Sequence, residues 1–382
     1  MPNSEPRIAY FISSHGFGHA TRACAVMAAM LERMPAARFE IFTQTPAWLF
    51  RDSLAAAFTL HSALTDVGLA QVGPMQADLP QTLRRLDEFL PFDDALVARL
   101  AEQVQRLRCA IVVCDIAPLG LAVARAARLP SVLIENFTWD WIYAEYVAEE
   151  PRLAAHIAYL QSAFASADYH LKTEPAFTAP EAAKVDLVTA PISRRPHTHP
   201  DEIRRQLGVP AAAKAVLITM GGIPEAYSFL DQLADYAEYH FVIPGSHGAT
   251  GRRATEQHAE ERRAVERRNN VTLLPHHSAY FHPDLVNACD AVVGKAGYST
   301  VAETYHAGVP LGYVLRARFR ESEVIKTFVE REMPGLALPA AEFNTGAWLA
   351  RLPDLLAQPR RPRGAPDGAA QAAEFIGRLL SK

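Results

Sequence analysis

The sequence predicts an α/β protein built from two doubly wound domains, each with a parallel sheet. The chain has 382 residues, which is the length of about two domains. Apolar residues make up 49% and charged residues 21%, so each half can bury a core of its own. Along the chain, short apolar runs alternate with longer segments of helical period. The runs are continuously apolar, which is typical of parallel strands covered by helices on both faces.

The first series of elements occupies the first half of the chain. Its predicted strands are Arg7–Ser13, Arg38–Thr43, Ala110–Asp115, Ser131–Asn136 and Tyr169–Lys172. Segments rich in Ala, Leu and Arg lie between several of them, and Thr21–Met34 and Asp94–Arg108 have the period of helices.

The same alternation restarts in the second half. Its predicted strands are Lys214–Met220, Tyr239–Pro244, Asn270–Leu274, Asp290–Val293 and Leu311–Leu315. The proline-rich stretch Glu174–Pro200 separates the two series and predicts a linker. We therefore expect domains at 1–195 and 196–358, followed by a tail, 359–382, with a terminal helix at Asp367–Leu380. Gly251–Asn270 mixes Arg and Glu at helical spacing, which predicts a solvated helix face.

Composition excludes several classes of function. Lys and Arg number 38 against 42 for Asp and Glu, a net charge of −4, which argues against nucleic-acid binding. No apolar stretch is long enough to cross a bilayer, and Met1–Arg7 lacks the layout of a signal peptide, so we expect a cytoplasmic protein. Four cysteines without a CxxC pair predict reduced core thiols rather than a disulfide or zinc site, namely Cys24, Cys109, Cys114 and Cys289.

A glycine loop with two histidines follows the first predicted strand. Gly16 and Gly18 allow a tight turn before a helix, which suits a ligand at the positive helix end. His15 and His19 flank these glycines at the carboxyl end of a strand, where packing explains an imidazole poorly. Either neutral imidazole can take a proton from a hydroxyl near neutral pH. The alternative is a histidine that only caps the helix.

A second glycine loop, Gly294–Thr300, follows a strand of the second half. Its glycines and the hydroxyls of Ser299 and Thr300 precede a helix and suit a diphosphate, although the spacing is not that of a Walker loop. Glu303 lies one helical turn further, where its carboxylate can accept hydrogen bonds from a ribose diol. The alternative is an acid that the helix dipole favours in a first turn.

An aromatic segment follows the strand that ends at Asn136. It contains Trp139, Asp140 and Trp141, and aromatic rings at this edge can stack on the apolar faces of sugars. The alternative is that the tryptophans pack in the core. His276, His277 and His282 follow another strand and either border a nucleotide base or lie on the surface.

These motifs together resemble the GT-B glycosyltransferase-like family. The resemblance rests on Gly294–Pro310 followed by Arg316 and Glu321, on the segment from His15 to Arg22, and on the segment from Asn136 to Tyr143. The family is similar to the UDP-GlcNAc transferase of peptidoglycan synthesis and includes the glycosyltransferase-like front half of plant arabinokinases. The resemblance implies two facing Rossmann-like domains with a cleft between them.

The resemblance also implies roles for residues. His19 would be the base, with His15 as the other candidate. The donor would be held by Gly221, Gly222, Gly297, Tyr298, Ser299, Thr300, Glu303 and Glu321. The acceptor would meet Phe17, Trp139, Asp140 and Trp141. Ala317, Arg320 and Ser322 around Glu321 depart from the acidic pattern of the arabinokinase-like relatives, so sugar recognition differs there.

The predicted function is metal-independent, inverting sugar transfer from a nucleoside diphosphate sugar, with UDP as the expected nucleotide, to a hydroxyl acceptor. No cofactor beyond this co-substrate is expected. Lys295 stands eight positions before Glu303, where a retaining enzyme with two spaced glutamates would have an acid, and this favours inversion. A nucleotide-sugar hydrolase, an epimerase and a non-catalytic nucleotide-sugar-binding protein stay open as alternatives.

Overall fold

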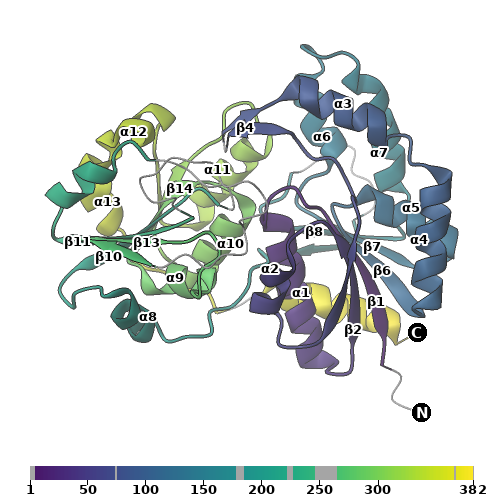
Figure 1. The fold of residues 1–382 in the computed structure, drawn as a ribbon, viewed down its shortest axis with the longest axis horizontal. Helices are drawn as coiled ribbons and strands as arrows, with labels where there is room; N and C mark the ends of the chain where they lie inside the picture. Colours follow the sequence, from purple (N-terminus) through teal and green to yellow (C-terminus); the bar gives the residue numbers. More distant parts are fainter. Residues whose placement is uncertain are drawn as a thin grey trace. The chain divides into compact units, whose positions relative to one another are not determined.

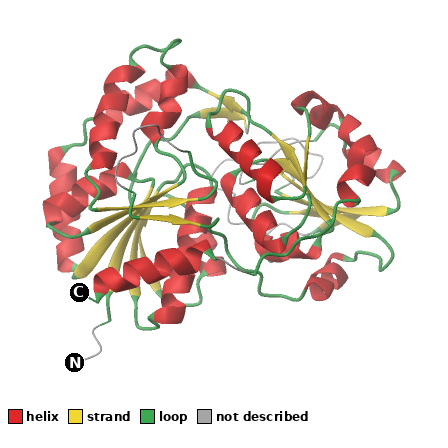
Figure 2. Ribbon diagram, turned by 180° about the vertical axis from the view of Figure 1, so that it is seen from behind, coloured by secondary structure: helices red, strands yellow, loops and turns green. Residues whose placement is uncertain are grey.

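The computed structural model describes residues 5–73, 75–177, 185–221, 227–245, 265–364 and 367–381. It divides the chain into two compact units, each with helices on both faces of a sheet (Figures 1 and 2). The first unit comprises Met1–Arg194, Arg318–Val324 and Ala365–Lys382, and the second comprises Arg195–Ala317 and Ile325–Gly364. The predicted α/β class with two parallel-sheet domains is confirmed.

The first unit contains a seven-stranded parallel sheet. Its order is β3-β2-β1-β6-β7-β8-β9. The strands are β1 (Arg7–Ile12), β2 (Arg38–Thr43), β3 (Phe58–Ser62), β6 (Cys109–Asp115), β7 (Ser131–Glu135), β8 (Tyr169–Thr173) and β9 (Leu187–Thr189). A separate short hairpin pairs β4 (Gln71–Gly73) with β5 (Gln76–Ala77).

Helices cover both faces of this sheet (Figure 1). The first unit contains α1 (Gly18–Arg33), α2 (Ala47–Ser53), α3 (Leu79–Phe89), α4 (Asp94–Arg106), α5 (Pro118–Ala127), α6 (Trp139–Tyr143), the 3₁₀ turn η1 (Ala144–Tyr146), α7 (Leu153–Ala165) and α14 (Gly368–Leu380). Side chains of β1 alternate between the faces: Ile8 and Tyr10 pack with α1, α2 and α14, whereas Ala9 and Phe11 pack with α4, α5 and α7. Both faces are therefore buried, as continuous apolar strands require.

One segment of the first unit differs from the sequence prediction, and the structure shows where the predicted terminal helix docks. The predicted linker Glu174–Pro200 is not linker throughout, because β9 within it joins the first sheet and pairs with β8. Three residues are too few for a clear hydrophobic pattern, which is why the prolines dominated the prediction. The terminal helix α14 packs against α1 and buries Ala369, Ala372 and Ile376 in the first core.

The second unit contains another seven-stranded sheet, with order β12-β13-β11-β10-β14-β15-β16. Its strands are β10 (Lys214–Thr219), β11 (Tyr239–Pro244), β12 (Glu266–Arg268), β13 (Val271–Leu274), β14 (Ala291–Lys295), β15 (Leu311–Val314) and β16 (Gly335–Ala337). All neighbours are parallel except β12, which pairs antiparallel with β13. The described part of Gly251–Asn270 therefore contains a strand and a turn rather than the predicted helix, whereas 246–264 lie outside the described residues.

Helices of the second unit also lie on both sides of its sheet (Figure 2). They are α8 (Pro200–Leu207), the 3₁₀ helix η2 (Leu230–Asp235), α9 (His282–Ala288), α10 (Tyr298–Ala307), α11 (Glu321–Glu332), α12 (Ala340–Thr345), the 3₁₀ helix η4 (Ala347–Arg351) and α13 (Leu352–Leu356). One core packs α8 to α11 on the strands. Phe229, Phe343 and Trp348 form a second aromatic cluster with ring centroids 5.5 to 6.2 Å apart.

The cysteines and the helices bear on the predicted thiol state and on membrane spanning. All four cysteines are buried and free of disulfides, as the sequence predicts. Within the described ranges, no helix combines the length and the apolar character needed to cross a membrane.

Candidate active site

Several buried polar side chains of the first unit lie at the carboxyl ends of its strands. Ser13 follows β1, Asp66 lies in the loop after β3, Asp115 ends β6 and Asn136 follows β7. Since all strands of this sheet are parallel, these loops lie at one edge. His19, in the first turn of α1, faces the same edge because it contacts Asp115.

A buried cluster of His19, Arg22 and Asp115 lies at this edge. His19 Nδ1 is 3.1 Å from Asp115 Oδ1. Arg22, one helical turn after His19, donates to both oxygens of Asp115, through Nε to Oδ2 at 2.8 Å and through Nη2 to Oδ1 at 2.6 Å. The exposed fractions of the three residues are 7%, 2% and 0%, so solvent does not screen these charges.

Arg22 determines the ionisation of Asp115. Burial alone would raise the pKa of this carboxyl, but the charge and hydrogen bonds of Arg22, together with His19, hold the pKa below its ordinary value. Asp115 is therefore ionised at neutral pH and can accept a hydrogen bond from a protonated Nδ1 of His19. With its proton on Nδ1, the imidazole keeps a lone pair on Nε2, which is the arrangement of a general base.

Two further residues extend this cluster. Arg22 Nη1 donates to Asn136 Oδ1 at 2.7 Å, and Asn136 Nδ2 donates to Glu321 Oε1 at 2.7 Å. Asn136 and Glu321 are 2% and 8% exposed. Glu321, expected from the resemblance among the donor ligands, lies in the segment Arg318–Val324 that folds with the first unit.

His15, the second candidate base, packs differently from His19. Its ring lies edge-on to Trp139 with centroids 5.0 Å apart. The ring also fills the space beside Gly68, whose φ is +64° and where an added Cβ would lie 2.5 Å from His15 Nδ1. The Gly68 carbonyl accepts a hydrogen bond from Tyr143 Oη at 2.7 Å. His15 is thus fixed by packing, whereas His19 is fixed by an ionised carboxylate.

Asp66 is a second buried carboxyl at the same edge. Its Oδ2 accepts a hydrogen bond of 2.5 Å from Trp139 Nε1, and its Oδ1 has no hydrogen-bond partner in the described structure. Burial raises the pKa of Asp66 to about 6, against the opposing effect of a hydrogen bond to Ser13 and the charge of His19. Two carboxyls at one edge, Asp66 and Asp115, therefore have pKa values displaced in opposite directions.

The predicted acceptor residues occupy different environments. Trp139 is 1% exposed and belongs to the core. Trp141 is half-buried: it stacks on Phe177 with centroids 4.6 Å apart, and the guanidinium of Arg320 lies 4.5 Å from its ring centre. Burial raises the pKa of Asp140, whose Oδ1 has no partner in the described structure. Phe17, the N-cap of α1, contacts Trp48 edge-on at 5.4 Å.

In the second unit, the predicted donor residues surround the start of α10. Gly297 is its N-cap, and Tyr298, Ser299 and Thr300 form its first turn, so these residues lie at the positive end of the helix dipole, which favours an anion. Gly221 follows β10 with φ +76°, and its N–H donates to Thr219 Oγ1 at 3.2 Å. Gly222 lies outside the described residues.

Glu303 is held by a histidine of the neighbouring helix. His282, the first residue of α9, places Nδ1 2.6 Å from Glu303 Oε2. The Glu303 side chain is 2% exposed. Of the three histidines singled out after the strand ending at Leu274, His282 therefore supports the predicted ribose ligand.

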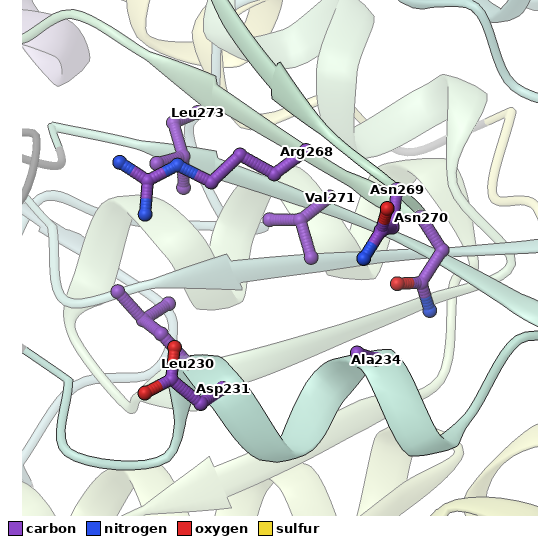
Figure 3. A pocket seen from close by; sticks show the side chains of 8 residues that line it. All are labelled: Leu230, Asp231, Ala234, Arg268, Asn269, Asn270, Val271 and Leu273. Carbon is purple, nitrogen blue, oxygen red and sulfur yellow. The ribbon is translucent and has the colours of Figure 1, made fainter.

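A pocket of about 140 Å³ lies elsewhere in the second unit (Figure 3). It is lined by Leu230, Asp231, Ala234, Arg268, Asn269, Asn270, Val271 and Leu273. These residues come from η2, the end of β12, the turn after it and β13, whereas the loop before α10 follows the carboxyl end of β14. The pocket therefore does not belong to the predicted donor site. Among the described side chains, no three His, Cys, Asp or Glu converge as metal ligands would.

Asp115 and Asp66 are site residues that the sequence analysis missed. For Asp115 a signal was present. The available signal was an acid that ends an otherwise apolar strand, Cys109–Asp115. Arg22 and Asn136 lie within the motifs, but nothing in the sequence shows that they meet, because 114 positions separate them.

Comparison with known proteins places the chain among sugar-transfer proteins in fold. No family model matches it. L-arabinokinase of Arabidopsis thaliana is 25% identical over 345 residues, which cover 89% of this chain. The match covers only 31% of the arabinokinase, so this chain spans about a third of the length of the curated relative.

Solved structures cover nearly the whole chain. The glycotransferase of kitacinnamycin superposes with a TM-score of 0.65 at 18% identity and covers 98% of this chain and 99% of its own. A UDP-glucosyltransferase from Polygonum tinctorium gives 0.61 at 15% identity, with 99% of both chains covered. Medicago truncatula UGT71G1, solved with UDP-glucose, gives 0.58 at 13% identity, with 100% of this chain and 95% of its own covered. At these identities the likeness establishes a shared fold.

Proposed function

The chain has the GT-B fold predicted from its sequence, and from this premise we propose that it is an inverting glycosyltransferase. The reaction moves a sugar from a nucleoside diphosphate sugar to a hydroxyl acceptor. One observation supports this proposal above the others: a buried imidazole, His19, is paired with an ionised carboxylate, Asp115, at the carboxyl edge of the first sheet. Fold likeness alone does not determine chemistry, so the proposal rests on this geometry.

His19 is the proposed general base. Asp115 accepts a hydrogen bond from the Nδ1–H group, which orients the ring and leaves Nε2 to take the proton of the acceptor hydroxyl. As that proton leaves, the hydroxyl oxygen forms a bond to the anomeric carbon, and the bond from this carbon to the diphosphate oxygen breaks. The electron pair of the broken bond leaves with the nucleoside diphosphate. Assistance by a base of this type contributes about 10²–10⁴-fold in rate.

The proposed donor site lies in the second unit. The N-terminus of α10, with Gly297 as N-cap, supplies N–H groups and a partial positive charge to the diphosphate. Glu303, fixed by His282, accepts from the ribose hydroxyls. This binding is proposed to need no metal, because the helix end itself offsets the diphosphate charge. UDP is the proposed nucleotide, since the Polygonum enzyme is named a UDP-glucosyltransferase and UGT71G1 was solved with UDP-glucose.

A single displacement at the anomeric carbon inverts its configuration. A retaining route would need a further acid near the donor, and Lys295 stands at the position where such an acid is expected. On the acceptor side, Phe17, Asp140 and Trp141 stay proposed contacts, whereas the core residue Trp139 would support them from behind. A cytoplasmic location is likewise part of the proposal.

NMR of the reaction mixture tests this function. We expect UDP-sugar consumption to be slow in buffer, to rise when a suitable hydroxyl acceptor is added, and to give a product of opposite anomeric configuration. His19→Ala should lower turnover by about 10²–10⁴-fold, because the hydroxyl then loses its base. His15→Ala is the matched control, since it removes a nearby imidazole that does not depend on Asp115 for its position.

Two outcomes would contradict the proposal. Fast release of free sugar at a rate that no added hydroxyl compound changes would identify a hydrolase. Loss of turnover in His15→Ala with full turnover in His19→Ala would show that the other imidazole is the base.

A further inference from the structure

We propose that Glu321 is a positioning residue for His19. Acting through Asn136 and Arg22, its carboxylate determines which ring nitrogen of His19 holds the proton. The consequence for turnover rests on the proposed function, whereas the consequence for the imidazole does not.

The path from Glu321 to His19 is a continuous series of buried contacts. Glu321 Oε1 accepts from Asn136 Nδ2 at 2.7 Å, and Asn136 Oδ1 accepts from Arg22 Nη1 at 2.7 Å. Arg22 in turn donates twice to Asp115, which lies 3.1 Å from His19 Nδ1. All five residues are less than 9% exposed, so water competes weakly for these hydrogen bonds.

The critical point on this path is a competition for His19 Nδ1. Arg22 Nη2 lies 2.6 Å from Asp115 Oδ1 and 3.3 Å from His19 Nδ1. If Nδ1 holds the proton, it donates to Asp115 and leaves Nε2 free to act as a base. If Arg22 instead donates to Nδ1, the proton must move to Nε2, and the imidazole cannot accept a proton there. The orientation of the guanidinium therefore selects the tautomer.

Asn136 and Glu321 fix that orientation. An arginine donates only, so the group facing Nη1 must be an acceptor. Asn136 presents its oxygen to Nη1 because its amide nitrogen is engaged by Glu321. Without that carboxylate, the amide can turn over and place its NH₂ group against Nη1. Two facing donors then displace the guanidinium from the position in which Nη2 serves Asp115.

The segment that contains Glu321 is anchored in the first unit at several points. Arg320 Nη1 donates to the Trp141 carbonyl at 2.8 Å, and Tyr146 Oη donates to the Arg318 carbonyl. Arg318 also pairs with Glu149. The chain on either side, through Ala317 and from Ile325, belongs to the second unit. The tautomer of His19 thus depends on a residue of Arg318–Val324, a first-unit segment that lies in the sequence between two stretches of the second unit.

The experiment is NMR of the full chain labelled with ¹⁵N-histidine, which distinguishes protonated from unprotonated ring nitrogens. The His19 signal is identified by its loss in His19→Gln. In the wild type we expect the Nδ1–H form to predominate. Glu321→Ala should shift His19 toward the Nε2–H form, and Asn136→Ala should do the same by breaking the path from within. Glu321→Gln keeps an acceptor oxygen for Asn136 and should retain the wild-type signal.

Glu149→Gln is the matched control, because it removes another carboxylate that holds the same segment but lies off the path. An unchanged His19 tautomer in folded Glu321→Ala would overturn the proposal, as would an equal change in Glu149→Gln. If Glu321 serves only as a donor ligand, its removal weakens UDP-sugar binding and leaves the tautomer intact. Sugar transfer plays no part in the measurement, so failure of the proposed function would appear separately, as absence of product.

Discussion

Asp115 and Asp66 show how two buried carboxyls at the carboxyl ends of the strands in one sheet acquire different ionisation. Asp115 contacts Arg22 at two points, and this pairing outweighs burial and lowers its pKa. Asp66 accepts from a neutral indole, so burial prevails and raises its pKa to about 6. A buried charge is tolerated where it is paired, and a group without such a partner tends to take up a proton instead.

Asp66 should therefore make stability depend on pH. Its pKa is raised from 3.8 in the ordinary state to about 6 in the fold. The stabilisation from protonated Asp66 is fully present below about pH 4 and is lost as the pH rises through about 6. Asp66→Asn removes this dependence. The free energy of unfolding of the variant should therefore rise relative to that of the wild type as the pH increases, by up to about 3 kcal/mol between about pH 4 and about pH 8.

Urea unfolding of wild type and Asp66→Asn across this range measures the difference. Asp94→Asn, an exposed carboxylate on α4, controls for the loss of one negative charge. A difference in unfolding free energy that stays constant with pH would mean that Asp66 is ionised throughout the range.

Individual site residues were predictable where a motif surrounded them. His19 and Gly297 lie in glycine loops at strand ends, and Glu303 follows the second of these loops; the structure places His19 in the first turn of α1, Gly297 just before α10 and Glu303 in the second turn of α10. The contacts that orient them were not predictable, because Asp115 and His282 reach their partners across 96 and 21 positions. Such contacts depend on how strands are ordered in the sheet, which one sequence does not specify.

Secondary structure elements were predictable in proportion to their length and burial. Arg38–Thr43 and Tyr239–Pro244 form strands with the predicted bounds, because each is an apolar run buried on both faces. The strands at the ends of the two seven-stranded sheets were missed, namely β3, β9, β12 and β16; three of them have only three residues, which is too few for a clear pattern. The terminal helix was predicted, but its docking against α1 became visible only in the structure.

The docking of α14 should contribute measurably to stability. Ile376 is fully buried against the first core, so Ile376→Ala leaves a cavity and should cost about 2–5 kcal/mol. Glu374 on the same helix forms an exposed pair with Arg33, and Glu374→Ala should change the unfolding free energy by less than about 1 kcal/mol. Denaturant unfolding measures the free energy of unfolding of both variants. A loss in Ile376→Ala as small as that in Glu374→Ala would show that α14 contributes little to the stability of the first unit.

At the scale of the whole molecule, the chain alternates between the two units more often than the sequence suggested. The first unit receives Arg318–Val324 and the terminal residues Ala365–Lys382 in addition to its N-terminal part. Consequently α11 begins with residues of the first unit and continues in the second. Sequence patterns locate strands and helices, but they do not show that a short connection such as Arg318–Val324 packs with the other series of strands.

This organisation predicts that nucleotide binding and proton transfer can be separated by substitution. The proposed UDP ligands lie around α10 in the second unit, whereas His19 belongs to the first. Glu303→Ala should weaken UDP binding by about 1.5–3 kcal/mol, because a buried carboxylate then no longer accepts from the ribose.

His19→Ala should leave UDP affinity unchanged while it lowers turnover, since the imidazole acts only on the acceptor hydroxyl in the proposed reaction. Calorimetric titration of the full chain, with and without EDTA, measures both affinities and the metal requirement together. We expect UDP to bind with equal affinity in the presence and absence of EDTA, because the α10 N-terminus offsets the diphosphate charge without a cation. Weakening of UDP by His19→Ala to the same extent as by Glu303→Ala would place the nucleotide against the base and contradict this division of roles.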